Sequence, residues 1–106
     1  MEPNTVLAFR DGPADLYMAR DVSALSLEVE GRTLPPEVAN PPIYGEGYFL
    51  TGRADRYQVK VLKETSLLKL EAEQFAWIRD VPIFKLRLKQ LTENREIFIH
   101  RALRTS

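Results

Sequence analysis

Apolar and polar residues alternate along the first two thirds of the chain in short runs that are typical of β-strands. The clearest runs are 25–29, which reads LSLEV, and 57–61, which reads YQVKV. A period of two places every second side chain on the core face of a sheet. Shorter apolar runs at 6–9, 16–19 and 66–70 add further strands. Five or more short strands separated by turns predict a small antiparallel barrel or sandwich.

Turn-forming residues separate these runs. Asp11-Gly12-Pro13 combines a residue that tolerates positive φ with one whose φ is fixed, as a tight turn requires. Residues 32–42 hold four of the seven prolines. Because proline has no backbone N–H to donate, we expect this stretch to be a surface loop and not a strand.

Helical signals begin at Glu71. Segment 71–79 has acidic residues in its first turn and apolar residues on one side, which favours a short helix. Pro82 disfavours helical geometry at the residue before it but is well placed to begin a helix. We therefore expect a second, longer helix over 82–104.

The second helix carries an apolar stripe that is broken by Arg95. The stripe recurs at spacings of three, four or seven and consists of Phe84, Leu88, Leu91, Phe98 and Ala102. Further apolar residues widen it, namely Ile83, Leu86, Ile97 and Ile99. Covering a small barrel uses only one side of such a helix, so the remainder could bury against a second copy or a partner protein. The alternative is that all of it packs within one chain.

Composition limits the class of protein. With 106 residues, 44% of them hydrophobic, we expect one domain over residues 1–106. Fifteen basic residues balance fifteen acidic ones, so no overall field attracts nucleic acid or an anionic membrane. From Arg79 onward the chain is basic, but the charges are scattered around the helix, and we expect no nucleic-acid partner.

The sequence contains few residues that could bind a metal or act as a nucleophile. The chain has no cysteine, which excludes disulfides and thiolate sites, and its one histidine, His100, falls near the end of a predicted helix. We expect His100 to be exposed, with no catalytic residue, no metal site and no cofactor; a metal-dependent barrel of the cupin kind would draw on several histidines. No export signal or membrane span is recognisable, and the expected compartment is the cytoplasm.

Three motifs, taken in order, resemble the cyclic nucleotide-binding domain family of catabolite-activator-type regulators and protein kinase A regulatory subunits. "LAFRDGPADLYMA" at 7–19 is similar to its early hairpin, and "YGEGYFLTG" at 44–52 to the start of its phosphate-binding cassette. "SLLKLEAEQF" at 66–75 is similar to its last barrel strand and following helix. The resemblance implies a jelly-roll-like antiparallel β-barrel over about 5–70, capped by helices over about 71–79 and 82–104. It also implies a stand-alone regulatory module whose ligand is cyclic AMP or cyclic GMP.

The resemblance also assigns roles within the cassette. Gly45 and the backbone of 47–49 would face the phosphate, and Glu46 would accept from the ribose hydroxyl. The family's phosphate-binding arginine is replaced by Asp55. Two like charges about 4 Å apart repel by on the order of 4 kcal/mol at an effective dielectric near 20, which corresponds to roughly a thousandfold in affinity.

Neighbouring residues leave two readings open. Tyr48 and Tyr57 bring bulk into the cassette, whereas a one-residue bulge would bring Arg53 or Arg56 toward it. The predicted ligand-binding residues are Gly45, Glu46, Gly47, Tyr48, Arg53, Arg56 and Tyr57. The first reading is a non-catalytic sensor of cyclic nucleotide with lost or altered binding. The second is a degenerate barrel that assembles with another protein, or as a homodimer, through its C-terminal helix.

Overall fold

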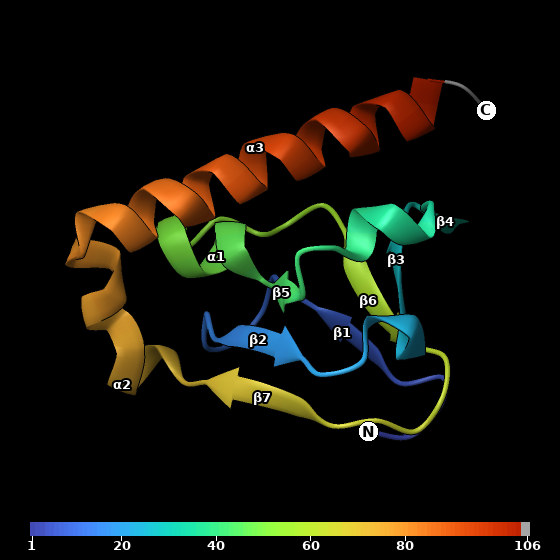
Figure 1. Cartoon of the computed structure of the whole chain (residues 1–106), viewed down its shortest axis with the longest axis horizontal. Helices are drawn as coiled ribbons and strands as arrows, with labels where there is room; N and C mark the ends of the chain where they lie inside the picture. Colours follow the sequence, from blue (N-terminus) through green and yellow to red (C-terminus); the bar gives the residue numbers. More distant parts are fainter. Residues whose placement is uncertain (105–106) are drawn as a thin grey trace.

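Two antiparallel sheets form the body of the molecule in the computed structural model, which describes residues 1–104 (Figure 1). The first sheet has the strand order β1 (Val6–Ala8), β6 (Gln58–Val61), β3 (Leu25–Val29) and β4 (Arg32–Thr33). The second has the order β5 (Ile43–Tyr44), β2 (Leu16–Ala19) and β7 (Leu67–Leu70). No strand ladder joins the two sheets within residues 1–104, so the predicted antiparallel β fold is observed but a closed barrel is not.

Strand β3 shows why the alternating pattern is predictive. Its residues Leu25, Leu27 and Val29 are buried, while the two between them are only partly covered. Leu27 lies opposite Val59 of β6 in the antiparallel register, so the apolar sides of both strands share one face. That face packs in the larger of two clusters of buried side chains. The position of Tyr57, just before β6, places its ring in the same cluster.

The proline-rich segment is more buried than expected. It contains β4 and a 3₁₀ turn, Pro36–Ala39, in which the Val38 amide donates to the Pro35 carbonyl. Leu34, Val38 and Ala39 are buried in the main core. The prediction of a surface loop therefore holds only in part: seven of residues 32–42 are exposed, but three are buried and the segment contains β4. Proline removes donors from a strand ladder, but it does not prevent the apolar residues between the prolines from packing inward.

Helices close the fold on one side. The predicted helix over 71–79 is split into α2 (Ala72–Phe75) and a 3₁₀ turn, Ala76–Asp80, and α3 (Pro82–Arg104) begins at the proline as expected. A helix that the pattern did not predict, α1 (Glu46–Thr51), lies between α3 and the strands (Figure 1). The second buried cluster consists of Leu16, Phe49 and Leu88, and thus joins β2, α1 and α3.

The buried stripe of α3 differs from the predicted one. It consists of Leu88, Leu91, Arg95 and Ile99. Phe84 and Phe98, which were assigned to the stripe, are 50% and 44% exposed. The stripe is centred on the arginine instead of being interrupted by it. His100 is exposed, as predicted. None of the helices within residues 1–104 is long and apolar enough to cross a membrane.

Candidate functional site

Two glycines set the boundaries of the cassette segment. Gly45 (φ 80°) and Gly52 (φ 76°) both adopt the left-handed conformation, at the start and at the end of α1. Glycine reaches this region without the steric penalty of a Cβ. Between them, α1 is anchored by Phe49, whose side chain is fully buried. The segment 45–52 is therefore a short helix with fixed entry and exit angles, and Glu46, its first residue, points into the protein interior.

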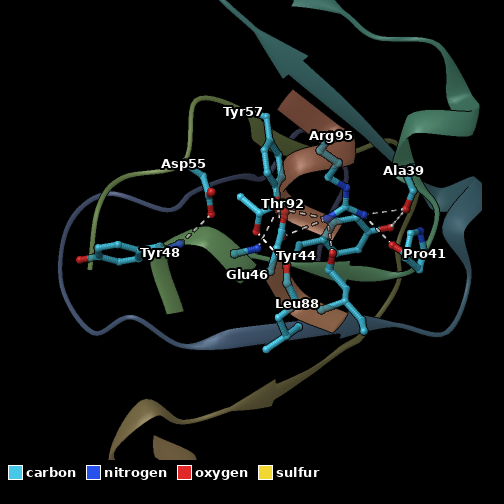
Figure 2. Close-up of polar contacts among 12 residues, drawn as sticks. Ala39, Pro41, Tyr44, Glu46, Tyr48, Asp55, Tyr57, Leu88, Thr92 and Arg95 are labelled. Carbon is cyan, nitrogen blue, oxygen red and sulfur yellow. Dashed lines mark hydrogen bonds and ion pairs between the residues drawn. The ribbon is translucent and has the colours of Figure 1, made fainter. Parts of the chain in front are cut away.

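Glu46 and Tyr57 form the first part of a buried polar network (Figure 2). The Tyr57 hydroxyl donates to Glu46 Oε2 at 2.6 Å, and the Gly45 backbone amide donates to the Tyr57 hydroxyl at 2.8 Å. Glu46 is 1% exposed and Tyr57 2% exposed. Both residues were predicted to bind a ligand, and the structure brings them together as partners of each other.

Arg95 of α3 completes this network from the other side. Its Nη1 donates to Glu46 Oε2 at 3.0 Å and to the Tyr57 hydroxyl at 3.3 Å. The guanidinium carbon also lies 5.0 Å from the centre of the Tyr44 ring and 5.5 Å from that of the Tyr57 ring, within the range of cation–π attraction. The guanidinium is thus held between a carboxylate and two aromatic rings.

The remaining donors of Arg95 bind the proline-rich segment. Nη2 donates to the Pro41 carbonyl at 2.6 Å and to the Ala39 carbonyl at 3.4 Å, and Nε donates to the Val38 carbonyl at 3.3 Å. Nη1 also donates to the Ile43 carbonyl. Because Arg95 is the only residue in this network with several donors in a planar fork, it can join α3, the 38–43 segment and the Glu46 carboxylate at once.

The Glu46 carboxylate is only half satisfied. Both the Arg95 and the Glu46 side chains are almost fully buried, 3% and 1% exposed, so each loses its hydration on folding. Glu46 Oε1 is buried and has no hydrogen-bond partner in the described part of the chain, whereas Oε2 accepts from Arg95 and Tyr57. A buried charge of this kind is tolerated only while its counter-charge stays in place.

Asp55, the residue at the expected arginine position, packs against α1. Its Oδ2 accepts from the Tyr48 amide at 3.2 Å, and its own amide donates to the Phe9 carbonyl at 3.0 Å. A Cβ at Gly47 would come within 2.2 Å of Asp55 Oδ1, so no larger residue fits there without displacing this carboxyl. Burial, followed by the negative charge of Glu46, raises the pKa of Asp55 to about 7.

Tyr48, Arg53 and Arg56, which were also predicted site residues, take no part in the hydrogen bonds between Glu46, Tyr57 and Arg95. The Tyr48 hydroxyl donates to the Gly12 carbonyl at 2.6 Å, and Arg56 forms an ion pair with Glu96 of α3 at 3.4 Å. The Arg53 residue is exposed. Neither arginine reaches Glu46. An open hollow of about 490 Å³ beside the cassette is lined by Asp55 and Arg56 but not by Glu46 or Tyr57.

The centre of the site was missed at the sequence level. Arg95 was recorded only as a break in an apolar stripe, although a charged residue in the middle of such a stripe must find a buried counter-charge or disrupt the packing. Glu46, the one carboxylate at the start of the cassette, was assigned to a ligand. Pairing the two required knowing that α3 crosses α1 (Figure 1).

The raised pKa of Asp55 predicts a pH-dependent stability. The unfolded chain releases this proton near pH 4, whereas the folded chain keeps it until about pH 7. The free energy of unfolding therefore falls as the pH rises from about 4 to about 7, and it falls no further from this cause above pH 7. Asp55→Asn should raise the free energy of unfolding at pH 8 by about 1–2 kcal/mol, after allowance for partial solvent exposure, and should have little effect at pH 4.

Chemical denaturation at several pH values measures this effect. Asp11→Asn is the matched control, because it makes the same chemical change at an exposed position. If Asp55→Asn and Asp11→Asn gave the same stability difference at pH 4 and at pH 8, the Asp55 carboxyl would not titrate as stated.

Comparison with known proteins gives no family for this chain: no protein-family model matches it, and no curated protein is significantly similar to it. Within residues 1–104, no three histidine, aspartate or glutamate side chains gather in a way that could hold a metal ion. Conclusions about function therefore depend on the geometry described above.

Proposed function

We propose that the chain is a non-catalytic regulatory module similar to cyclic nucleotide-binding domains, in which Arg95 occupies the ligand position and the module acts through contacts with other proteins. One observation carries the proposal. The Glu46 carboxylate, which the resemblance assigns to the ribose of a ligand, is bound instead by Arg95 of α3 and by Tyr57.

A ligand that used Glu46 would have to displace an established network. Moving Arg95 away breaks its bonds to the carbonyls of the 38–43 segment, and moving Tyr57 removes the acceptor of the Gly45 amide. Buried groups left without partners each cost about 1–3 kcal/mol. Asp55 adds an opposing charge for an anionic ligand, although this charge is reduced below about pH 7, where the carboxyl is protonated.

Thermal unfolding in the presence of cyclic AMP and cyclic GMP tests whether Arg95 closes the site, that is, whether its bond to Glu46 prevents a nucleotide from binding there. A bound ligand at a hundred times its dissociation constant adds about 2.7 kcal/mol, which shifts the midpoint of a domain of this size by about 10 °C or more. We expect a shift of less than about 1 °C at roughly 1 mM of either nucleotide, because the carboxylate is already engaged.

Asp55→Asn separates the two causes of the expected lack of binding. This variant removes the opposing charge while keeping an oxygen that can accept from the Tyr48 amide. If Arg95 closes the site, the variant should be as insensitive to the nucleotides as the wild type. A shift in the variant alone would attribute the loss to charge, and a shift in the wild type would refute the closed site.

The sensor reading remains a second candidate, because one carboxylate serves both α3 and the expected ribose contact. A ligand able to replace Arg95 on Glu46 would also release the main polar anchor of α3. Ligand binding and helix release would then be the same event, with an equilibrium set by the difference in affinity for the two states. The cytoplasm stays the proposed compartment, in keeping with the cysteine-free sequence.

A further inference from the structure

Strand β7 forms an open edge of the second sheet. It pairs with β2 on one side only, because it stands last in the strand order β5, β2, β7, and it is the lowest strand in Figure 1. With four residues it is also longer than any other strand that ends a sheet within residues 1–104. Proteins usually keep such edges short or cover them, so an open edge of this length is available to a strand from another chain.

The register of the sheet identifies the backbone groups of β7 that face outward. The Ala19 amide donates at 3.0 Å to a carbonyl just before β5, on the far side of β2 from β7. Because the amides of an antiparallel strand point alternately to its two neighbours, the Met18 amide points to β7, where Met18 lies opposite Leu68. The N–H and C=O groups of Leu68 are therefore used within the sheet. Those of Leu67 and Lys69 point outward, and no further backbone hydrogen bond reaches either residue within residues 1–104.

An extended segment already pairs with the chain just before β7. The Thr65 amide donates to the Met1 carbonyl at 3.0 Å, and the Met1 amino group donates to the Thr65 carbonyl. This mutual exchange is the pattern of antiparallel strands. By the same alternation, the outward groups of Leu67 and Lys69 are the next ones on this side, so a strand added to β7 has a natural direction, antiparallel to it.

One face of the sheet beside β7 is only half covered. Leu16 and Leu70, which lie opposite each other, pack in the second buried cluster. Met18 and Leu68 occupy the same face two residues further along, and Leu68 is 58% exposed. An open hollow of about 490 Å³ lies beside them and is also lined by Arg20. A strand added at the edge would place one of its side chains opposite Leu68, over this hollow, where an apolar group fits best.

Two cations at this edge select the charge of the added strand. Lys69 on β7 and Arg20 just after β2 are both exposed, and neither forms an ion pair within residues 1–104. A second copy of β7 is a poor partner. Pairing two copies about Leu68 would place each Lys69 against Leu67 of the other copy, and pairing them about Lys69 would bring the two lysines together. An acidic strand instead gives both cations a partner.

We propose that residues 66–69 are a docking edge, to which an extended acidic segment of a partner protein adds as a strand antiparallel to β7. Backbone hydrogen bonds to the edge supply affinity, and alternate side chains supply specificity. The partner places an apolar side chain opposite Leu68 and an acidic one opposite Lys69. A second acidic side chain, opposite Ser66, reaches Arg20 across the small serine. The inference rests on the proposed function, because it names the surface through which that module contacts another protein.

The acetylated and amidated peptide KTEITE is the probe for this edge. In the antiparallel register its six residues lie opposite positions 71 to 66 in turn, with its lysine opposite Glu71, its first glutamate opposite Lys69, its isoleucine opposite Leu68 and its last glutamate opposite Ser66. Titration into isotope-labelled protein, followed by backbone amide shifts, measures the binding. We expect a dissociation constant of about 10–500 µM, as suits a small interface. No binding at about 2 mM peptide would refute the docking edge.

Methylation of single peptide amides separates strand addition from a contact between side chains. The amide of the second threonine faces the Leu67 carbonyl and donates to it, whereas the amide of the isoleucine faces away from β7. N-methylation of that threonine should weaken binding at least about 10-fold, and N-methylation of the isoleucine less than about 2-fold. Equal effects of the two methyl groups would contradict pairing with the backbone of β7.

Substitution of Leu68 tests the apolar contact. Leu68→Glu should weaken binding of the peptide at least about 10-fold, because it places a charge against the isoleucine. Leu86→Glu is the matched control: Leu86 is 51% exposed on α3 and lies outside the second sheet, so this variant should bind like the wild type. Equal binding by the two variants would place the peptide somewhere other than on β7.

Charge reversal tests the direction of the added strand. Arg20→Glu should weaken binding of KTEITE about 5-fold, and the peptide KTEITK should bind this variant as KTEITE binds the wild type, since the pair is re-formed with opposite sign. If KTEITK bound Arg20→Glu no better than KTEITE does, the antiparallel register would be wrong. The nucleotide titration above is repeated on Leu68→Glu, so that the two proposals fail separately. A nucleotide-dependent shift there contradicts the closed site, whereas a wild type that does not bind the peptide contradicts the docking edge.

Discussion

Arg95→Met is expected to lower the free energy of unfolding by about 3–5 kcal/mol, the cost of removing one partner of a buried ion pair. Methionine keeps much of the apolar volume of the side chain but provides no donor. Glu46 would then be buried with one oxygen already unpartnered and the other bound only by Tyr57. The carbonyls of Val38, Pro41 and Ile43 would lose their donor as well.

Urea unfolding followed by circular dichroism gives this difference directly. Arg87→Met is the matched control, because Arg87 lies on the same helix and is exposed, and the effect there should stay within about 0.5 kcal/mol. If Arg95→Met is too unstable to purify, the double variant Glu46→Gln with Arg95→Met provides the measurement. Removing both charges should recover about 2 kcal/mol relative to the single variant, and no recovery would contradict a coupled pair.

Gly45→Ala is expected to cost about 2–4 kcal/mol. Two causes add: a left-handed conformation that strains any residue with a Cβ, and a Cβ placed 2.9 Å from the Phe9 ring and 3.1 Å from the Asp15 carbonyl. The Asp15 carbonyl belongs to the backbone and has little freedom to move. The beginning of α1, and with it the direction of Glu46, depends on this close approach.

Gly12→Ala isolates the packing contribution. Gly12 has the same φ of 80°, but nothing lies within 4 Å of the Cβ that alanine would add. This control should therefore lose only the conformational cost of about 1 kcal/mol. Equal losses in the two variants, measured by the same denaturation, would mean that the contacts with Phe9 and Asp15 are relieved without cost.

The strands were predictable because their signal is local. Leu25, Leu27 and Val29 alternate with polar residues, and the alternation alone identifies both the strand and its buried face. The beginning of α3 was equally local, since Pro82 restricts its own geometry and that of the residue before it. Such signals depend on neighbours within a few positions and are not overridden by the rest of the fold.

The site could not be predicted in the same way, because its contacts are long-range. Glu46 was assigned to the ribose of a ligand, but it is bound by Arg95, which lies 49 positions further along the chain. α1 was missed because it contains only six residues and owes its form to Gly45 and to the burial of Phe49. Phe84 and Phe98 are exposed although their spacing places them on the same side of α3 as Arg95, so periodicity alone does not specify which positions of the stripe are covered.

The reach of Arg95 has a consequence for the order in which the molecule matures. Arg95 lies within α3, and its hydrogen-bond partners lie 38 to 57 positions earlier in the chain. During synthesis, both sheets leave the ribosome before α3 does, and Glu46 has no neutralising group until residue 95 has emerged. The nascent chain can therefore collapse early, but the network around Glu46 cannot form until α3 has left the ribosome.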